Sequence, residues 1–150
     1  MVAALLILLA MVGVGVVLNP SREQFDWFIR LRRPAWLSFE ALIPLIWISI
    51  YACFYGSALL AWNGSWSLGI MAGYLGLLPL VQSYTWLICT TRRLAHGTLV
   101  GLVGWLWGAA LALIVLPHSG PAVLLLIPYL LWSPLGTLVT WQMQRLNRGP

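Results

Sequence analysis

The sequence predicts an all-α integral membrane protein, a bundle of five transmembrane helices. Hydrophobic residues make up 61% of the 150 residues and charged residues only 7%, with a mean hydropathy of +0.92. About a quarter of an ordinary soluble domain is charged, so this chain has too little charge to cover a soluble fold. The chain also divides into five apolar runs, each about as long as the roughly 17–25 residues that cross the hydrocarbon core.

The first run, residues 2–18, is predicted to be a retained transmembrane helix. A cleavable secretory signal is the alternative, but the run has no positively charged segment before it, and Leu18-Asn19-Pro20 is a poor cleavage site. The sequence Asn19-Pro20-Ser21 is expected to end this helix, because the residue before a proline is pushed out of the helical region.

Residues 21–40 form the long polar connection, which carries four arginines and all three acidic residues, Glu23, Asp26 and Glu40. The other four helices are predicted at 42–62, 67–90, 98–116 and 122–144. A tight turn is expected at Asn63-Gly64-Ser65, and residues 117–121 should break the chain again. Prolines within the predicted spans each free a backbone carbonyl; these are Pro44, Pro79, Pro128 and Pro134.

Glycines recur at intervals of three or four residues along two of the predicted helices. This spacing places them on one helix face, where a neighbouring backbone can approach closely. The face is interpreted first as packing within the bundle, with a homodimer or other partner helix as the alternative. The glycines concerned are Gly69, Gly73 and Gly76 on helix 67–90, and Gly97, Gly101, Gly104 and Gly108 on helix 98–116.

Several classes of function are excluded by the distribution of ionisable residues. No carboxylate lies deep in a span, which argues against a proton-coupled transporter and against paired-carboxylate hydrolysis. His96 and His118 are predicted as loop residues on opposite sides of the membrane, so they cannot share a metal. Cys53 and Cys89 lie in apolar runs without metal-ligand spacing and are interpreted as buried thiols. Nucleic-acid binding is excluded because the basic charge belongs to a chain buried in lipid.

Ten tryptophans are the chemically distinctive feature of the chain. Those near predicted interfaces are typical of an aromatic belt; they are Trp27, Trp62, Trp66 and Trp141. Three others, Trp47, Trp86 and Trp132, lie within spans, where an indole either packs in the core, finds a partner for its N–H or lines a cavity. Together with Arg30, Arg32 and Arg33 they indicate either a membrane anchor or a site for a flat, apolar, anionic molecule.

The tryptophan-rich stretch resembles the TspO/MBR family, the tryptophan-rich sensory or translocator proteins formerly called peripheral benzodiazepine receptors. The family signature reads W-Y-x-x-L-x-K-P-x-W, followed by W, Y and W at intervals of eleven, four and eleven residues. The matching residues here are Trp27-Phe28, Leu31, Arg33-Pro34, Trp36, Trp47, Tyr51 and Trp62. Further along, Pro128-Tyr129-Leu130-x-Trp132 is similar to the family's P-Y-L-A-W, and Arg145-x-Asn147 to its R-x-N.

This resemblance implies a five-helix bundle, often a homodimer, whose pocket opens toward the long first connection. Family members bind porphyrins and haem-type tetrapyrroles, animal members bind cholesterol and benzodiazepine-type drugs, and some bacterial members degrade protoporphyrin using light and oxygen. The catalytic residues implied for that activity are Trp47 and Trp132. No metal ligand and no covalently bound cofactor are implied. The ligand-binding residues implied are Arg33, Pro34, Trp36, Trp47, Tyr51, Gln82, Trp86, Tyr129 and Trp132.

Departures from the family pattern indicate a divergent member. Ser38-Phe39 replaces a proline pair, so the connection is expected to close differently. Gln82 stands where the family has asparagine, with the nearby tryptophan displaced by one position to Trp86, and Gly101 replaces an acid. Trp141 occupies the tyrosine position of the cholesterol motif, a weak motif even when intact.

The function expected from the sequence is therefore binding of a tetrapyrrole, protoporphyrin or haem-type, in sensing, transport or disposal. The pocket is expected between helices 2–18, 42–62 and 122–144 and the connection 21–40. There Trp36, Trp47 and Trp132 would stack on the ring, and the arginines at 30, 32 and 33 would pair with its propionates. The alternatives are a sterol or lipid carrier and a small accessory subunit of a larger membrane complex. Whether the chain is also an enzyme is left open.

Arginine placement predicts the orientation in the membrane. The connection 21–40 carries four arginines, residues 91–97 two and the C-terminal tail two (Arg145 and Arg148), whereas the opposite face has none. The positive-inside rule then puts the C-terminus and the connection 21–40 in the cytoplasm and the N-terminus outside. A C-terminal fluorescent-protein fusion should fluoresce, and a C-terminal alkaline phosphatase fusion should be inactive. An active phosphatase fusion would reverse the assignment.

Overall fold

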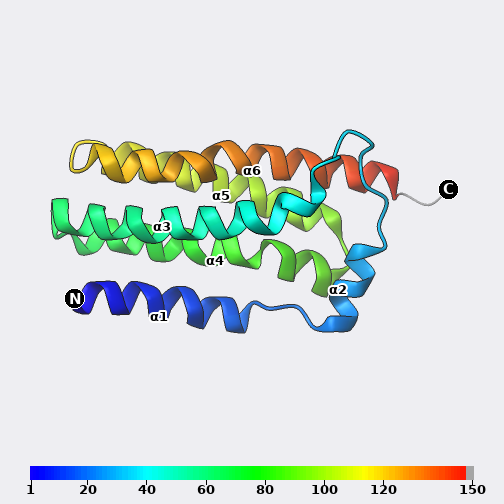
Figure 1. Ribbon diagram of the computed structural model, residues 1–150, viewed down its shortest axis with the longest axis horizontal. Coiled ribbons are helices and arrows are strands. Elements are labelled where there is room, and N and C mark those ends of the chain that lie inside the picture. The colour runs from blue at the N-terminus through cyan, green and yellow to red at the C-terminus, as the bar shows by residue number, and fades with distance from the viewer. Residues whose placement is uncertain (148–150) are drawn as a thin grey trace.

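The protein is an all-helical bundle, in a computed structural model that describes residues 1–147 (Figure 1). Five long helices lie side by side, and a short helix and a 3-10 turn occupy the connection between the first two of them. This confirms the predicted all-α class, with no strand among the residues described. The elements are α1 (Val2–Val17), α2 (Arg22–Ile29), η1 (Glu40–Leu42), α3 (Ile43–Ser65), α4 (Leu68–Thr91), α5 (Leu94–Val115) and α6 (Gly120–Leu146).

The number of spans is only partly as predicted. By length and hydropathy, Glu40–Ser65, α5 and α6 are able to cross a membrane, and α1 with α2 makes a fourth candidate bent by 79°. α1 alone has 16 residues. α4 is not among the candidates, since Pro79 and the polar run 82–85 lower its hydropathy. The multi-pass membrane architecture stands, but five spans are not established by these criteria.

Basic side chains gather at one end of the bundle. α1 begins at one end of the bundle, and α2, the start of the segment that follows it, the α4–α5 connection and the end of α6 lie at the opposite end (Figure 1). These segments carry Arg22, Arg30, Arg32, Arg33, Arg92, Arg93 and Arg145. Arg148, which the sequence analysis also counted on this side, lies outside the described residues. The arginines are therefore gathered at one end of the bundle, while the side of the membrane on which that end lies stays a prediction.

The turn predicted at Asn63-Gly64-Ser65 is wrong, because these residues continue α3. The helix ends instead at Trp66, which adopts the left-handed conformation with φ 50° and donates its N–H to the Trp62 carbonyl at 2.8 Å. A Cβ at Gly64 would lie 2.7 Å from the carbonyl oxygen of His118, in the α5–α6 connection. This glycine therefore permits close approach of two connections and does not make a turn.

The start of α5 at Leu94, and not at residue 98, is a second correction. Arg92 takes the left-handed conformation that ends α4, and Arg93 already caps α5. His96, expected in a loop, therefore lies in the first turn of α5, where its Nδ1 is 2.9 Å from the Thr91 hydroxyl.

The short helix α2 was missed within the connection 21–40, although its start signal is present in the sequence. The Ser21 hydroxyl accepts from the Gln24 N–H at 3.3 Å, and the Gln24 side-chain oxygen accepts from the Ser21 N–H at 3.0 Å. This reciprocal arrangement is a capping box, which requires Ser or Thr followed three residues later by Glu or Gln. α2 bends sharply away from α1 and packs against α4.

Prolines in the helices have different consequences. Pro44 lies in the first turn of α3, where a backbone N–H has no acceptor within the helix. Its missing N–H therefore costs no helical hydrogen bond, and the carbonyl that we expected it to free is not left without a partner by the proline. Pro134 lies inside α6 and deprives the Leu130 carbonyl of its usual partner four residues on. The indole Nε1 of Trp105 on α5 donates to that carbonyl at 3.1 Å. The Trp105 indole on the neighbouring helix thus supplies the hydrogen bond that Pro134 cannot donate to the Leu130 carbonyl.

Glycine faces of α4 and α5 are filled from within the chain. Cβ atoms at the α5 glycines would collide with side chains of α4 and α6, namely Ile88, Thr137 and Tyr129. Cβ atoms at Gly73 and Gly76 of α4 would meet Leu111 and Trp107 of α5. These glycines therefore serve packing inside the bundle, whereas a Cβ at Gly69 would meet only Ser67, at 3.6 Å, and a homodimer contact stays a prediction.

Two buried clusters hold the helices together. The larger joins α3, α4, α5 and α6. The fully buried Ser57 bonds to two of its members: its hydroxyl lies 2.6 Å from the Tyr74 hydroxyl and donates to the Ala122 carbonyl at 2.7 Å. The smaller, at the arginine-rich end, joins Leu37 of the connection to α4, α5 and α6. α1 buries no residue fully and contacts only the surface of α3 and α4.

The Trp105–Pro134 pairing can be tested by a double-mutant cycle. Trp105→Phe should lower the stability of the detergent-solubilised protein by about 1–3 kcal/mol, because the partly buried Leu130 carbonyl loses its donor. In a Pro134→Ala background residue 134 has an N–H of its own, so the same substitution should cost much less. Thermal unfolding of the four proteins measures both steps. Equal losses in the two backgrounds would show that the indole N–H does not compensate for the proline.

Candidate ligand-binding site

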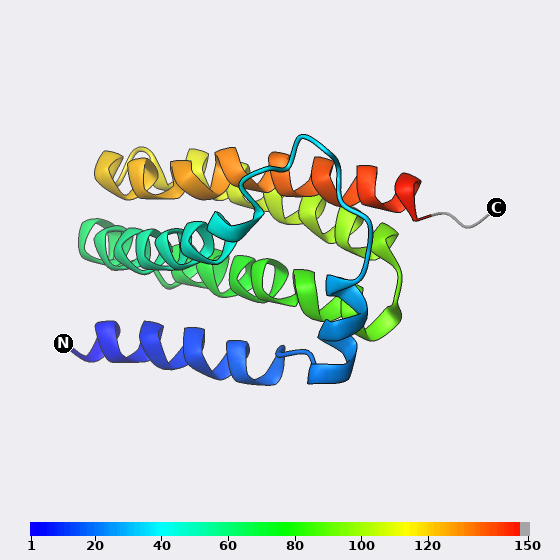
Figure 2. The same ribbon diagram turned by 45° about the vertical axis from the view of Figure 1, so that its right-hand side comes forward.

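A cavity of about 450 Å³ lies at the arginine-rich end of the bundle. This is within the range of roughly 300–1,000 Å³ that is usual for sites of small ligands. Its walls come from α2, α3, α4, α6 and the segment 30–40, which we call the strap. Figure 2 shows the strap passing from α2 across this end to α6 and back to α3. The lining residues are Phe25, Phe28, Ile29, Arg33, Leu37, Glu40, Ile43, Pro44, Trp47, Tyr84, Thr85, Trp132, Gly136, Val139, Thr140 and Met143.

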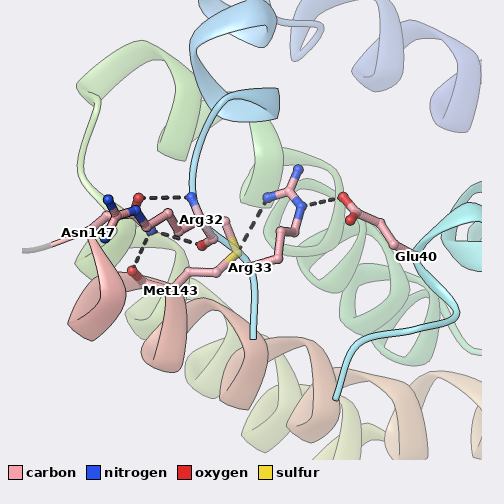
Figure 3. Close-up of polar contacts among 5 residues, drawn as sticks. All are labelled: Arg32, Arg33, Glu40, Met143 and Asn147. Atoms are coloured by element: carbon pink, nitrogen blue, oxygen red, sulfur yellow. Dashed lines mark hydrogen bonds and ion pairs between the residues drawn. The ribbon is translucent and has the colours of Figure 1, made fainter. Parts of the chain in front are cut away.

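The strap is fastened to the last turns of α6. The Asn147 side-chain amide pairs with the Arg32 backbone in both directions, accepting from its N–H and donating to its carbonyl, each at 2.9 Å (Figure 3). The indole of Trp36 donates to the Gln142 side chain at 2.7 Å. Next to Trp36 in the chain, Leu37 is only 6% exposed and packs into the smaller core cluster. These contacts hold the strap over the cavity.

Arg33 is the cationic group of the cavity. Its Nε forms an ion pair with Glu40, its Nη1 lies 3.5 Å from the Met143 sulfur, and its guanidinium lies 4.9 Å from the centre of the Phe28 ring. Figure 3 shows the guanidinium between Glu40 and Met143. All four residues line the cavity. The positive charge is therefore held at the strap side of an otherwise largely apolar space.

Trp47 of α3 and Trp132 of α6 form the aromatic part of the wall. Trp47 lies 5.8 Å from the ring of Tyr51, and Phe39 of the strap meets Trp132 edge-on at 6.5 Å. The Trp132 Nε1 is buried and has no hydrogen-bond partner among the described residues. It lies beside Gly136, which also lines the cavity. A buried donor without a partner is costly, so this N–H is well placed to meet an acceptor on a ligand.

Of the residues expected at the site, Arg33, Trp47 and Trp132 line the cavity together. Pro34 is buried in the strap without lining it. Trp36 points away, 42% exposed and bonded to α6, so Leu37 takes the inward position that was expected of Trp36. In the pair Ser38-Phe39, the Phe39 ring reaches Trp132, and whether the relatives close this segment differently stays a prediction.

Two expected residues, Tyr51 and Gln82, line an adjoining groove of about 530 Å³. This groove shares Phe25 and Thr85 with the cavity. The Gln82 Nε2 donates to the Met11 carbonyl of α1 at 3.0 Å, while its Oε1 is buried without a partner in the described part of the chain.

Tyr129 and Trp86 lie outside both spaces. Tyr129 is 4% exposed and fills the room that Gly104 and Gly108 leave on α5. It borders only a void of about 20 Å³, which is enough for about one water molecule. Trp86 is half-buried on α4 and is not among the lining residues of the cavity or of the adjoining groove.

The helices that form the cavity differ from those expected. The sequence placed the pocket between the first, second and fifth predicted spans, but α1 contributes no lining residue to the cavity. α1 packs against α3 and α4, and at this end its Gly15 and the C-cap residue Leu18 line the adjoining groove. Its place in the wall is taken by α4, through Tyr84 and Thr85, and by α2.

Several lining residues were not identified from the sequence. Tyr84 donates its hydroxyl to the Gly136 carbonyl at 3.0 Å and bonds the Thr140 hydroxyl, so it fixes α4 to α6 behind Trp132. A signal was available on α6, where Trp132, Gly136, Thr140 and Met143 follow intervals of four, four and three residues. That spacing places them on one helix face.

Comparisons with known proteins agree with this architecture. The sequence profile of the TspO/MBR family matches residues 3–146. The chain is 30% identical to a translocator protein from Ovis aries over 138 residues, 85% of this chain and 78% of that one. It is 27% identical to a tryptophan-rich sensory protein from Cereibacter sphaeroides over 133 residues, 89% and 82% of the two chains. Because the match takes in the strap and every helix of the bundle, the chain belongs to the TspO/MBR family of multi-pass membrane proteins.

Proposed function

We propose that this chain is a membrane tetrapyrrole-binding protein that holds a porphyrin or haem-type ligand in the cavity beneath the strap. The observation that carries the proposal is the unpaired, buried N–H of Trp132 in a cavity with aromatic walls and one cationic side chain. A large flat ring with polar atoms in it and carboxylates at its edge matches these three features. The expected role is sensing, transport or disposal of such a ligand.

The contacts follow from the lining. Trp47 and Trp132 offer indole faces from two different helices, and aromatic rings stack or meet edge-on with a gain beyond the area they bury. Arg33 is the partner for a ring carboxylate, because Arg30 and Arg32 do not line the cavity. Guanidinium and carboxylate form strong paired hydrogen bonds. The apolar remainder, including Leu37, Ile43 and Val139, surrounds the ring edge.

We further propose that all five long helices cross the membrane, with the N-terminus outside. α4 has 24 residues and lies along α5, which passes the span criteria itself. α1 lies along α3 and α4, and α2 turns from it by 79°, as a helix lying along the membrane surface would. The cavity then opens on the cytoplasmic side, where its arginine lies near the headgroups.

A lipid or sterol carrier remains the second candidate, and one observation favours it. A second groove, of about 360 Å³ and almost wholly apolar, lies between α1, α3 and α4 toward the other end of the bundle. Its one buried hydroxyl, on Tyr74, is already paired with Ser57. Such a surface fits an acyl chain or sterol but offers a porphyrin carboxylate no partner.

The cavity assignment predicts the effect of removing both indoles. Trp47→Phe with Trp132→Phe should weaken protoporphyrin binding at least tenfold, about 1.4 kcal/mol, because the ring loses stacking area and the Trp132 donor. Quenching of the remaining tryptophan fluorescence by protoporphyrin measures the affinity. The matched control is Trp66→Phe with Trp141→Phe, which removes two exposed indoles outside the cavity. Equal affinities for the two double variants would show that the ligand does not use this cavity.

The nature of the bound molecule gives a second prediction. Protein purified from its native membrane in mild detergent should carry a Soret absorbance band, which arises from a tetrapyrrole and from no sterol or phospholipid. The Trp47→Phe, Trp132→Phe variant prepared in parallel should carry less of it. Protein without a Soret band, but with stoichiometric lipid or sterol in its extract, would favour the carrier instead.

A further inference from the structure

We propose that Glu40 is an internal counterion that a ligand carboxylate must displace from Arg33, so that this pair determines the preference of the site for carboxylate-bearing ligands. The inference rests on the proposed function, since it concerns the same cavity. It goes further in naming which ligand group is recognised, which residue recognises it and which residue competes with it.

The geometry separates a fixed partner from a movable one. Arg33 lies on the strap, Glu40 begins η1 seven residues later, and both line the cavity. The Arg33 side chain is 18% exposed, whereas that of Glu40 is 47% exposed. Glu40 is therefore able to turn into water with little loss, because exposed ion pairs contribute little stability. The Arg33 side chain is mostly buried, so it cannot turn into water in the same way.

Other contacts keep Arg33 in place when Glu40 leaves. Its guanidinium lies 4.9 Å from the centre of the Phe28 ring, a cation–π distance. The backbone of the preceding residue, Arg32, is clamped to Asn147. The cation thus belongs to the wall of the cavity, and the loss of Glu40 does not release it.

The hydrogen-bonding capacity of Arg33 is only partly used. A guanidinium has five N–H donors in a planar fork. Within residues 1–147, its side-chain partners are one oxygen of Glu40 on Nε and the sulfur of Met143 on Nη1. A thioether is a weak acceptor. A ligand carboxylate that takes two parallel N–H bonds would replace a single-point ion pair and a weak contact with a stronger arrangement.

Charge balance favours the exchange. With Glu40 in place the Arg33 charge is neutralised, and a second carboxylate would face the first across one guanidinium. An uncharged ligand leaves the pair intact and has no effect on Glu40. An anionic ligand must overcome the attraction between Arg33 and Glu40 before it gains its own. Glu40 therefore lowers affinity for acids and leaves affinity for neutral analogues unchanged.

The test compares protoporphyrin IX with its dimethyl ester, which has the same ring without the two charges. Both are titrated into the full-length protein in detergent, using Glu40→Gln, Arg33→Gln and the control Arg30→Gln. Arg30 is exposed and lies outside the cavity, so its loss controls for the general charge of this end. Thermal unfolding of each variant, and of Glu40→Ala as a second removal of the charge, establishes that the bundle is intact.

Glu40→Gln should bind the diacid about three- to tenfold more tightly, the equivalent of a partly exposed ion pair, with the ester unchanged within twofold. Arg33→Gln should weaken the diacid about tenfold and leave the ester unaffected. Arg30→Gln should change neither ligand by more than twofold.

Three results would overturn the inference. If Glu40→Gln shifts acid and ester equally, the pair only closes the strap. If neither Glu40→Gln nor Glu40→Ala changes the acid, Glu40 is not a competing counterion. Binding of the wild-type protein to both ligands without any effect of Arg33→Gln overturns the inference while leaving the proposed function in place. Failure of the wild-type protein to bind either ligand would overturn the proposed function itself.

Discussion

The candidate site depends on the attachment of the strap to the C-terminal turns of α6. The Asn147 side-chain amide accepts from the Arg32 N–H and donates to the Arg32 carbonyl, as the backbone of a neighbouring strand does in a β-sheet. Together with the Trp36–Gln142 bond and the packing of Leu37, this side chain holds the strap against α6. Leu37, Arg33 and Glu40 take their places in the wall as a consequence. Without that attachment the arginine-rich end of the bundle would be an open groove.

The helices below the strap are held at close range by small residues, and their spare polar groups are paired. The glycines of α5 admit Tyr129 and Thr137, and Trp105, Tyr84 and Ser133 satisfy backbone carbonyls on the neighbouring helices. In a membrane such pairing is required, because lipid offers no alternative partner. Against this background, the unpaired buried atoms of Trp132 and Gln82 are exceptions. Both border the connected spaces at the arginine-rich end, which is why we interpret them as groups that meet a ligand.

The sequence predicted the helical class, the approximate position of each long helix and the meeting of Arg33, Trp47 and Trp132 in one wall. It did so because apolar length and the family spacing are local properties of the chain. Which helix stands beside which is not local, so α1 was placed in a wall that α4 and α2 form. The outward turn of Trp36 likewise depends on Gln142, which is 106 residues away. The missed helix α2 is a different case, because its capping box at Ser21 and Gln24 is a local signal that is present in the sequence.

Shape and charge are determined by different parts of this cavity. Trp47 and Trp132 belong to long helices packed on several sides, so the distance between the indoles is fixed by the bundle. Arg33, Glu40 and Phe39 belong to the strap, which is joined to the bundle by a few contacts at α6 and by its two ends. A substitution in the strap therefore changes the charge that a ligand meets, or the edge that Phe39 presents to Trp132, at little cost to the helices. The replacement of the family's proline pair by Ser38-Phe39 falls in this segment. The strap is therefore the part of the wall whose chemistry can change without repacking the helices.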